Sequence, residues 1–327
     1  MSLLSTANRT DTHQPNLSRW TAIGGVWVFV LVMLGAFTTS IGAGMIFLDW
    51  PLSNGSLNPE GWLTDVMMFA EHSHRLSAGL MSFITIAIWL AVWKYEARAW
   101  VRNVALFAVI LVFVQAGVGG LRVLMDHLHI DMVNTSVGRL FAMLHACLAQ
   151  VYLCVLLTIS LALSKAWIAS AAGSFDDEIK RIARWCCGLL LLQLAIAAIM
   201  RHSYAGLAIP TFPLSSSEGD LLPPIWSFRV SIHFAHRVMA VVLTGFLIWF
   251  AVRLWKSPAT GAGLRSAAAW MVAMLVGQIA LGASAIWTFR NPYVTTGHVL
   301  LGACLLATTF GLTLWVHCRG RAENNLA

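Results

Sequence analysis

Eight apolar stretches, each long enough to cross a lipid bilayer as a helix, dominate this chain of 327 residues. A helix needs about 20 apolar residues to span the hydrocarbon core. With 58% hydrophobic and 11% charged residues, the chain has too few charges to cover a soluble protein of this size. The sequence therefore predicts an all-α integral membrane protein with eight transmembrane helices. The stretches lie at roughly 22–48, 69–93, 101–125, 136–163, 184–203, 229–254, 264–288 and 293–316.

Basic residues predict how the chain is oriented. They flank the termini and the connections that follow the even-numbered spans, as Lys94, Arg98 and Lys256 do, whereas the opposite connections hold acids such as Asp49 and Glu60. Because basic residues stay on the cytoplasmic side, we expect both termini to be cytoplasmic, in a multi-pass protein of the plasma membrane. The net charge of +7 reflects this topology, and the scattered basic residues give no patch for nucleic acid.

The second half of the sequence repeats the first. Residues 43–53 match residues 205–215, and in the same register Glu71-x-x-His74-Arg75 matches His233-x-x-His236-Arg237. With four spans in each copy, both copies enter the membrane in the same direction. We therefore expect two tandem, parallel-repeat four-helix bundles.

The repeat also predicts the domain boundaries. Residues 1–163 form the first bundle and residues 184–327 form the second. Residues 164–183 include the acidic run Asp176-Asp177-Glu178, and a charge run between apolar segments is typical of a solvated connection. We expect this segment to be a cytoplasmic linker between the bundles.

Four histidines share one predicted depth. They are His74, His145, His236 and His298. Each lies about 5–10 residues inside the outer end of its span, which is roughly 7–15 Å below the outer surface at the rise of an α-helix. In each predicted bundle one histidine comes from the second helix and one from the fourth, so facing imidazoles could bind one iron as axial ligands. A lone membrane histidine usually only hydrogen-bonds a neighbouring helix, but four at matching depth favour ligation.

The number of ligands favours haem over a bare metal ion. Zinc or copper would need carboxylates or thiols in addition to two histidines, and only the first half offers a nearby carboxylate, that of Glu71. A porphyrin supplies four nitrogens, so two histidines complete the iron. The hypothesis is two haem sites with His74, His145, His236 and His298 as metal ligands.

Charged residues beside the histidines suggest further roles. Arginines near the outer ends of the spans, including Arg75, Arg237, Arg122 and Arg201, could pair with haem propionates or extend towards the lipid headgroups, and Arg75 and Arg237 are the favoured propionate partners. Glu71 lies one helical turn before His74, whereas its counterpart is a histidine. The first half is thus expected to do chemistry, with Glu71 catalytic, although an acid at a helix N-terminus is also favoured by the helix dipole alone.

Together these residues resemble the haem A synthase family, membrane enzymes of cytochrome oxidase biogenesis. The resemblance covers the loop Asp49-Trp50-Pro51-Leu52-Ser53-Asn54-Gly55, the motif Glu71-x-x-His74-Arg75, and His145, His236-Arg237 and His298. It implies oxidation of the C8 methyl of haem O to the formyl group of haem A by successive hydroxylations. It also implies that the N-terminal histidine pair binds the substrate haem and the C-terminal pair a haem b cofactor, with Glu71 in catalysis.

The same resemblance implies partners, and one departure limits it. Haem O is expected to arrive through the membrane lipid from a haem O synthase, and cytochrome oxidase assembly factors are further expected partners. Many bacterial relatives have a cysteine pair in the first outer loop, where this chain has Ser53 and no cysteine. A thiol-based role of that loop is therefore not expected here.

Two other classes compete with the enzyme. A di-haem b membrane electron-transfer cytochrome would hold its haems near opposite surfaces, whereas all four histidines here are predicted near the outer one. A haem transporter would need no acid at Glu71 and would leave the porphyrin unchanged. The identity of the haem extracted from the protein separates these classes.

Overall fold

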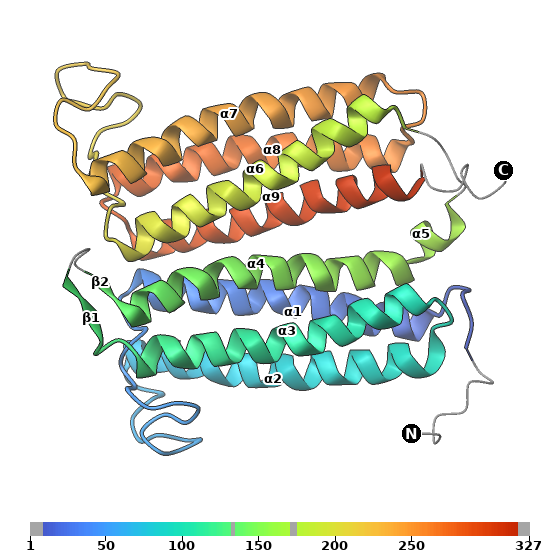
Figure 1. The fold of residues 1–327 in the computed structure, drawn as a ribbon, viewed down its shortest axis with the longest axis horizontal. Helices are drawn as coiled ribbons and strands as arrows, with labels where there is room; N and C mark the ends of the chain where they lie inside the picture. Colours follow the sequence, from blue (N-terminus) through green and yellow to red (C-terminus); the bar gives the residue numbers. More distant parts are fainter. Residues whose placement is uncertain (1–8, 132–134, 171–174, 320–327) are drawn as a thin grey trace. The chain divides into compact units, whose positions relative to one another are not determined.

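The computed structural model describes residues 9–131, 135–170 and 175–319, and these form an almost entirely helical protein (Figure 1). Eight of the described helices are long and apolar enough to cross a membrane, which confirms the predicted class and number of spans. The helices are α1 (Pro15–Ser40), α2 (Val66–Tyr95), α3 (Ala99–Leu124), α4 (Val137–Leu163), α5 (Lys165–Ala169), α6 (Asp177–His202), α7 (Phe228–Lys256), α8 (Ala262–Trp287) and α9 (Pro292–Arg319). Two short strands, β1 (His129–Ile130) and β2 (Thr135–Ser136), pair between α3 and α4.

Polar side chains cap the helices that follow the long or irregular connections. Asp65 accepts hydrogen bonds from two amides in the first turn of α2. Ser136 and Ser227 each accept one from the first turn of α4 and of α7. The first amides of a helix have no partner within the helix, so these caps satisfy donors that would be costly to leave unpaired near a bilayer.

The first span differs from its predicted bounds. Helix α1 begins at Pro15, whose fixed φ suits the first turn of a helix, and it ends at Ser40. Soon after, Gly42 has a φ of +77°, a left-handed conformation that a helix cannot continue. Residues 41–48, predicted as the end of the span, therefore belong to the following loop.

The predicted linker, residues 164–183, is partly helical. It contains α5 and the first turns of α6, and residues 171–174 lie outside the described part of the chain. Asp177 and Glu178 occupy the first turn of α6, where the helix dipole favours negative charge. The acidic run, predicted to be a solvated connection, thus also forms a helix start.

The chain divides into two compact units, one with α1 to α5 and the other with α6 to α9. In the first unit α1 and α3 each pack against both α2 and α4, which places α2 and α4 on one diagonal of a four-helix bundle. In the second unit α6 and α8 each pack against both α7 and α9, so α7 and α9 form the corresponding diagonal. The internal repeat and the domain boundaries remain predictions, and this equivalent packing supports the repeat.

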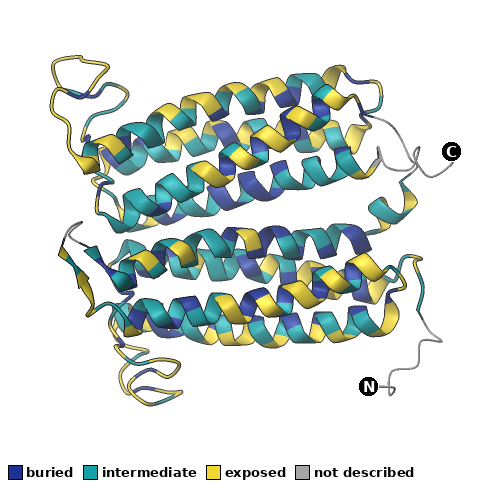
Figure 2. Cartoon of the chain, in the orientation of Figure 1, coloured by how far each residue is buried: buried dark blue, intermediate teal, exposed yellow. Residues whose placement is uncertain are grey.

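The surface of each bundle is apolar. Large exposed side chains such as Phe83, Ile110 and Trp270 lie along the helices, where Figure 2 shows many exposed residues. An apolar surface of this extent is unusual for a protein in water and suits contact with lipid tails. The protein is therefore a multi-pass membrane protein.

Candidate functional site

The four predicted histidines occupy equivalent places in the helices. Helices α2, α4, α7 and α9 begin at the end of their unit where the long loops 41–65 and 203–227 lie, which we call the loop end (Figure 1). The histidine is the ninth residue of α2, α4 and α7 and the seventh of α9. Each therefore lies about two helical turns inside the loop end.

Each predicted pair comes together inside its own bundle. His74 on α2 and His145 on α4 are close enough to interact electrostatically, and so are His236 on α7 and His298 on α9. All four residues are of intermediate exposure, and the Nδ1 atoms of His74, His236 and His298 are buried.

Glutamine side chains and backbone fix the protonation of three rings. Nδ1 of His145 lies 3.0 Å from the carbonyl oxygen of Gln115, which only accepts, so Nδ1 must donate and Nε2 keeps its lone pair. In the second bundle Nε2 of His298 lies 3.4 Å from the amide nitrogen of Gln278, and Nε2 of His236 lies 3.4 Å from that of Gln193. An amide nitrogen only donates, so these Nε2 atoms accept and carry no hydrogen, and a metal bound there would take the place of the glutamine amide. This is the form of imidazole that binds a metal.

The donor set fits a haem better than a bare ion. Among the described residues, no group of three or more histidine, cysteine, aspartate or glutamate side chains could hold a metal. Two imidazoles leave zinc or copper under-coordinated but complete the iron of a porphyrin.

Glycines on the neighbouring helices make room for the rings. A Cβ added at Gly35 of α1 would lie 2.8 Å from Cε1 of His74, and one at Gly119 of α3 would lie 2.9 Å from Cε1 of His145. At Gly282 of α8 the distance to Cε1 of His298 would be 3.1 Å. Only glycine allows these contacts without displacement. The sequence contains a signal that could have pointed to Gly119 and Gly282. Each lies four residues after a glutamine, Gln115 or Gln278.

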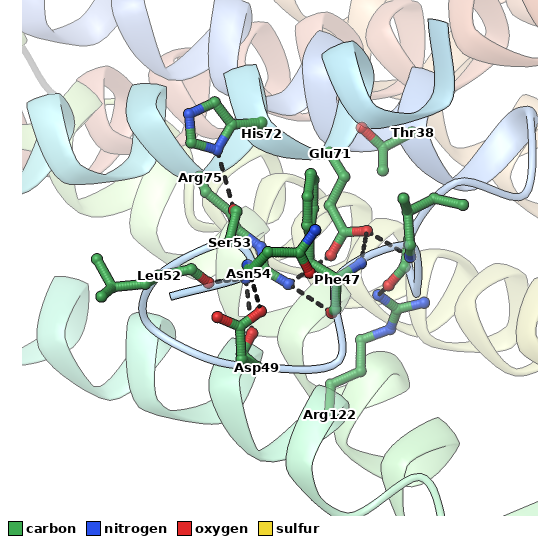
Figure 3. Close-up of polar contacts among 12 residues, drawn as sticks. Thr38, Phe47, Asp49, Leu52, Ser53, Asn54, Glu71, His72, Arg75 and Arg122 are labelled. Carbon is green, nitrogen blue, oxygen red and sulfur yellow. Dashed lines mark hydrogen bonds and ion pairs between the residues drawn. The ribbon is translucent and has the colours of Figure 1, made fainter. Parts of the chain in front are cut away.

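Glu71 is part of a clamp on the first loop. Its Oε2 accepts hydrogen bonds from the backbone amides of Ile46 at 2.7 Å and Phe47 at 3.2 Å, and its Oε1 lies 2.6 Å from the guanidinium of Arg75 (Figure 3). The carboxylate is almost fully buried. Glu71 thus ties the start of loop 41–65 to α2.

Arg75 completes this clamp. Besides the bond to Glu71, its guanidinium donates to the backbone carbonyls of Phe47 at 2.9 Å, Asp49 at 2.7 Å and Leu52 at 2.5 Å. A direct contact with a propionate would require Arg75 to give up some of these bonds. The propionate role predicted for Arg75 remains a prediction, and these contacts favour a role in holding the loop.

The second unit has the same clamp with a different acid-base group. Arg237 donates to the carbonyls of Ile209 at 3.0 Å, Thr211 at 2.5 Å and Leu214 at 3.2 Å. The amide of Ile209 donates to Nδ1 of His233 at 3.2 Å, just as that of Phe47 donates to Glu71. His233 therefore replaces the acceptor function of Glu71 but not its negative charge. The predicted propionate role of Arg237 also stays a prediction.

The Asp-Trp-Pro-Leu-x-Asn-Gly motif forms a turn around the side chain of Asp49. Asp49 accepts hydrogen bonds from the amides of Asn54 at 2.9 Å and Gly55 at 2.7 Å, and both residues have positive φ. Burial alone would raise the pKa of Asp49, but these bonds and the charge of Arg75 outweigh it and hold that pKa below its usual value. An ionised aspartate thus holds the turn together.

His72 supports the same loop from α2. Its Nδ1 lies 2.9 Å from Oγ of Ser53, and its Nε2 lies 3.1 Å from the carbonyl oxygen of Leu57 (Figure 3). The ring is buried and both nitrogens are engaged by the loop. Ser53 therefore has a structural partner in this loop. No sequence pattern pointed to this contact.

Further arginines besides those of the clamps act on the histidine pairs, to which Arg75 and Arg237 also contribute. Arg122 of α3 donates to the carbonyl of Gly44, and its charge acts on both His74 and His145. In the second unit, Arg201 acts on His298 and is close enough to Arg290 for the two charges to interact. Positive charge gathered beside each pair would favour an anionic group bound there.

Comparisons with known proteins cover nearly the whole chain. The family model COX15-CtaA, described as "Cytochrome oxidase assembly protein", matches residues 18–310. The chain is similar to the "Heme A synthase" of Geobacillus kaustophilus, with 26% identity over 310 residues that cover 90% of each protein. Proteins of the same name from Bacillus licheniformis and Staphylococcus haemolyticus are 25% and 24% identical. These two alignments cover 85% and 86% of this chain and 88% and 89% of the relatives.

Proposed function

The chain belongs to the COX15-CtaA family of cytochrome oxidase assembly proteins and is an oxidoreductase of haem A synthesis, and from that premise we propose what each bundle does. The first bundle binds haem O as substrate between His74 and His145. The second bundle binds a haem b cofactor between His236 and His298. The observation that supports both sites most directly is the pairing of two imidazoles in each bundle, without a third metal ligand among the described residues.

Arg122, Arg201 and Arg290 are proposed to bind the propionates. Arg122 interacts with both histidines of the first pair, whereas Arg201 interacts with His298 and with Arg290. Charge-assisted bonds from a guanidinium to a carboxylate are strong and well suited to this contact. The propionate edge of each haem would then face the loop end of its bundle. Arg75 and Arg237 would act on it through the loops that they hold.

The proposed reaction converts the C8 methyl of haem O to the formyl group of haem A by successive hydroxylations. Haem iron supplies the oxidising chemistry, and the protein contributes binding, orientation and proton handling. His74 and His145 hold the substrate between diagonal helices, where lipid-facing side chains exclude bulk water. Glu71, one turn before His74 on α2, is proposed as the catalytic group that accepts or delivers a proton. Arg75 fixes its carboxylate at 2.6 Å.

The cellular setting follows from the same proposal. The protein resides in the plasma membrane with both termini cytoplasmic, as the basic residues predict. Haem O reaches it laterally through the membrane lipid from a haem O synthase. Its product passes towards cytochrome oxidase, with assembly factors as partners.

Extraction of haem from the purified protein tests this function. We expect haem b alone when the protein is produced without a source of haem O, and haem A or a hydroxylated intermediate in addition when haem O is supplied. Mass spectrometry and pyridine haemochrome spectra identify these haems. Haem b alone under both conditions would instead indicate the electron-transfer cytochrome, and unchanged haem O would indicate the transporter.

The glycine beside His145 gives a matched pair of variants. We expect Gly119→Ala to lower haem content in the first bundle, because its Cβ would lie 2.9 Å from the ring of His145. Gly117→Ala is the control, since a Cβ on Gly117 of the same helix meets nothing within 4 Å. Haem per protein is measured after purification. Equal haem content in the two variants would show that His145 is not held at a binding position.

A further inference from the structure

A polar pair crosses the core of the first bundle on the inner side of its histidines. Oγ1 of Thr85 on α2 lies 2.5 Å from the hydroxyl of Tyr152 on α4, and both residues are buried. Thr85 follows His74 by eleven residues and Tyr152 follows His145 by seven, which are close to three and two whole helical turns. The pair therefore lies on the same helix faces as the histidines, across the same diagonal. Along the helix axes the pair lies about 16 Å inward of His74 and about 10 Å inward of His145, and we call it the floor.

Assigning the two hydroxyl hydrogens shows which atom of this pair can still form a hydrogen bond. Thr85 donates its only hydroxyl hydrogen to the carbonyl oxygen of Met81 at 2.6 Å. Tyr152 must then be the donor in its bond to Thr85, which uses its only hydrogen. The phenol oxygen of Tyr152 keeps acceptor capacity and no donor. Its next partner must be a hydrogen-bond donor.

The second bundle has an apolar floor at the same places. Eleven residues after His236 stands Leu247, and seven residues after His298 stands Leu305. Both leucines are buried. The two bundles thus match in their histidine pairs and differ in the group that lies inward of them. A polar floor suits a ligand with a polar side group, whereas a floor of leucines suits a ligand without one.

We propose that Tyr152 determines the haem specificity of the first bundle by accepting a hydrogen bond from the hydroxyl of the hydroxyethylfarnesyl side chain of haem O. This inference rests on the proposed function of the two bundles. Propionates at the loop end would turn the opposite porphyrin edge, which bears that side chain, towards the floor. Haem b has a vinyl group at that position and no hydroxyl, which suits the leucines of the second bundle.

Two iron porphyrins that differ in their hydroxyls test this proposal without turnover. Iron haematoporphyrin has hydroxyethyl groups where iron mesoporphyrin has ethyl groups. Protein purified from cells without haem O, with haem b in its second bundle, is titrated with each and followed by the Soret band. We expect wild type to prefer iron haematoporphyrin by about fivefold, the worth of one neutral hydrogen bond, and Tyr152→Phe to lose that preference.

Controls separate this contact from packing. Tyr95→Phe, at the far end of α2, and Thr85→Val, which keeps the phenol oxygen, should both retain the preference. If Tyr152→Phe weakens the binding of both porphyrins equally, Tyr152 only packs against the ligand. If the preference is unchanged, the phenol oxygen makes no contact with it. Either result overturns the proposal. Failure of the proposed function is distinguishable, because wild type would then bind neither porphyrin in its first bundle.

Discussion

Replacing His74 with alanine is expected to empty the haem site of the first bundle and to leave that of the second intact. His74 and His145 are close enough to interact electrostatically, and no third ligand among the described residues could take the place of His74. A porphyrin iron with one protein ligand binds far more weakly than one with two. Haem O supplied to cells should therefore not be recovered with the purified variant, whereas haem b should be retained at about one per protein.

The measurement is haem identity and stoichiometry after extraction, with absorption spectra of the intact protein. His236→Ala should give the reverse result, with haem b lost from the second bundle. His72→Gln is the matched control, because His72 lies two residues from His74 but bonds only to the loop through Ser53 and Leu57. Loss of both haems in His74→Ala would show a general folding defect. Retention of both would exclude His74 as a ligand.

The helices and the histidine pairs were predictable because they depend on short-range patterns. Apolar runs of the length of a bilayer gave all eight spans, and a histidine at one depth in four helices predicted pairs that the bundles bring together. The end of α1 was misplaced because a left-handed Gly42 ends the helix within an apolar run, where hydropathy gives no signal.

The clamps and the floor were not predictable because they are contacts between distant parts of the chain. The sequence revealed that His233 replaces Glu71, but not that both side chains accept an amide of the preceding loop. Tyr152 and Thr85 are 67 residues apart, and each alone resembles an ordinary residue of a membrane helix. Only the packing of α2 and α4 on one diagonal brings them together.

Glu71→Gln is expected to retain haem in both bundles and to lower the conversion of haem O by about 100-fold, within the range of general acid–base catalysis. The amide oxygen of glutamine can still accept from the backbone of Ile46 and Phe47, so the loop remains attached. Glutamine cannot exchange a proton, and it leaves Arg75 without its ion pair. The measurement is the ratio of haem A and hydroxylated intermediates to haem O after extraction.

A second variant separates catalysis from the clamp. Glu71→His copies the second unit, in which His233 accepts the loop amide, and it should hold loop 41–65 as well as glutamine does. Limited proteolysis of the loop reports whether it does. If the loop stays protected in both variants and conversion falls in both, the carboxylate itself acts in the reaction. If Glu71→Gln keeps full conversion, the carboxylate is not required for the reaction, and the clamp is the function of Glu71.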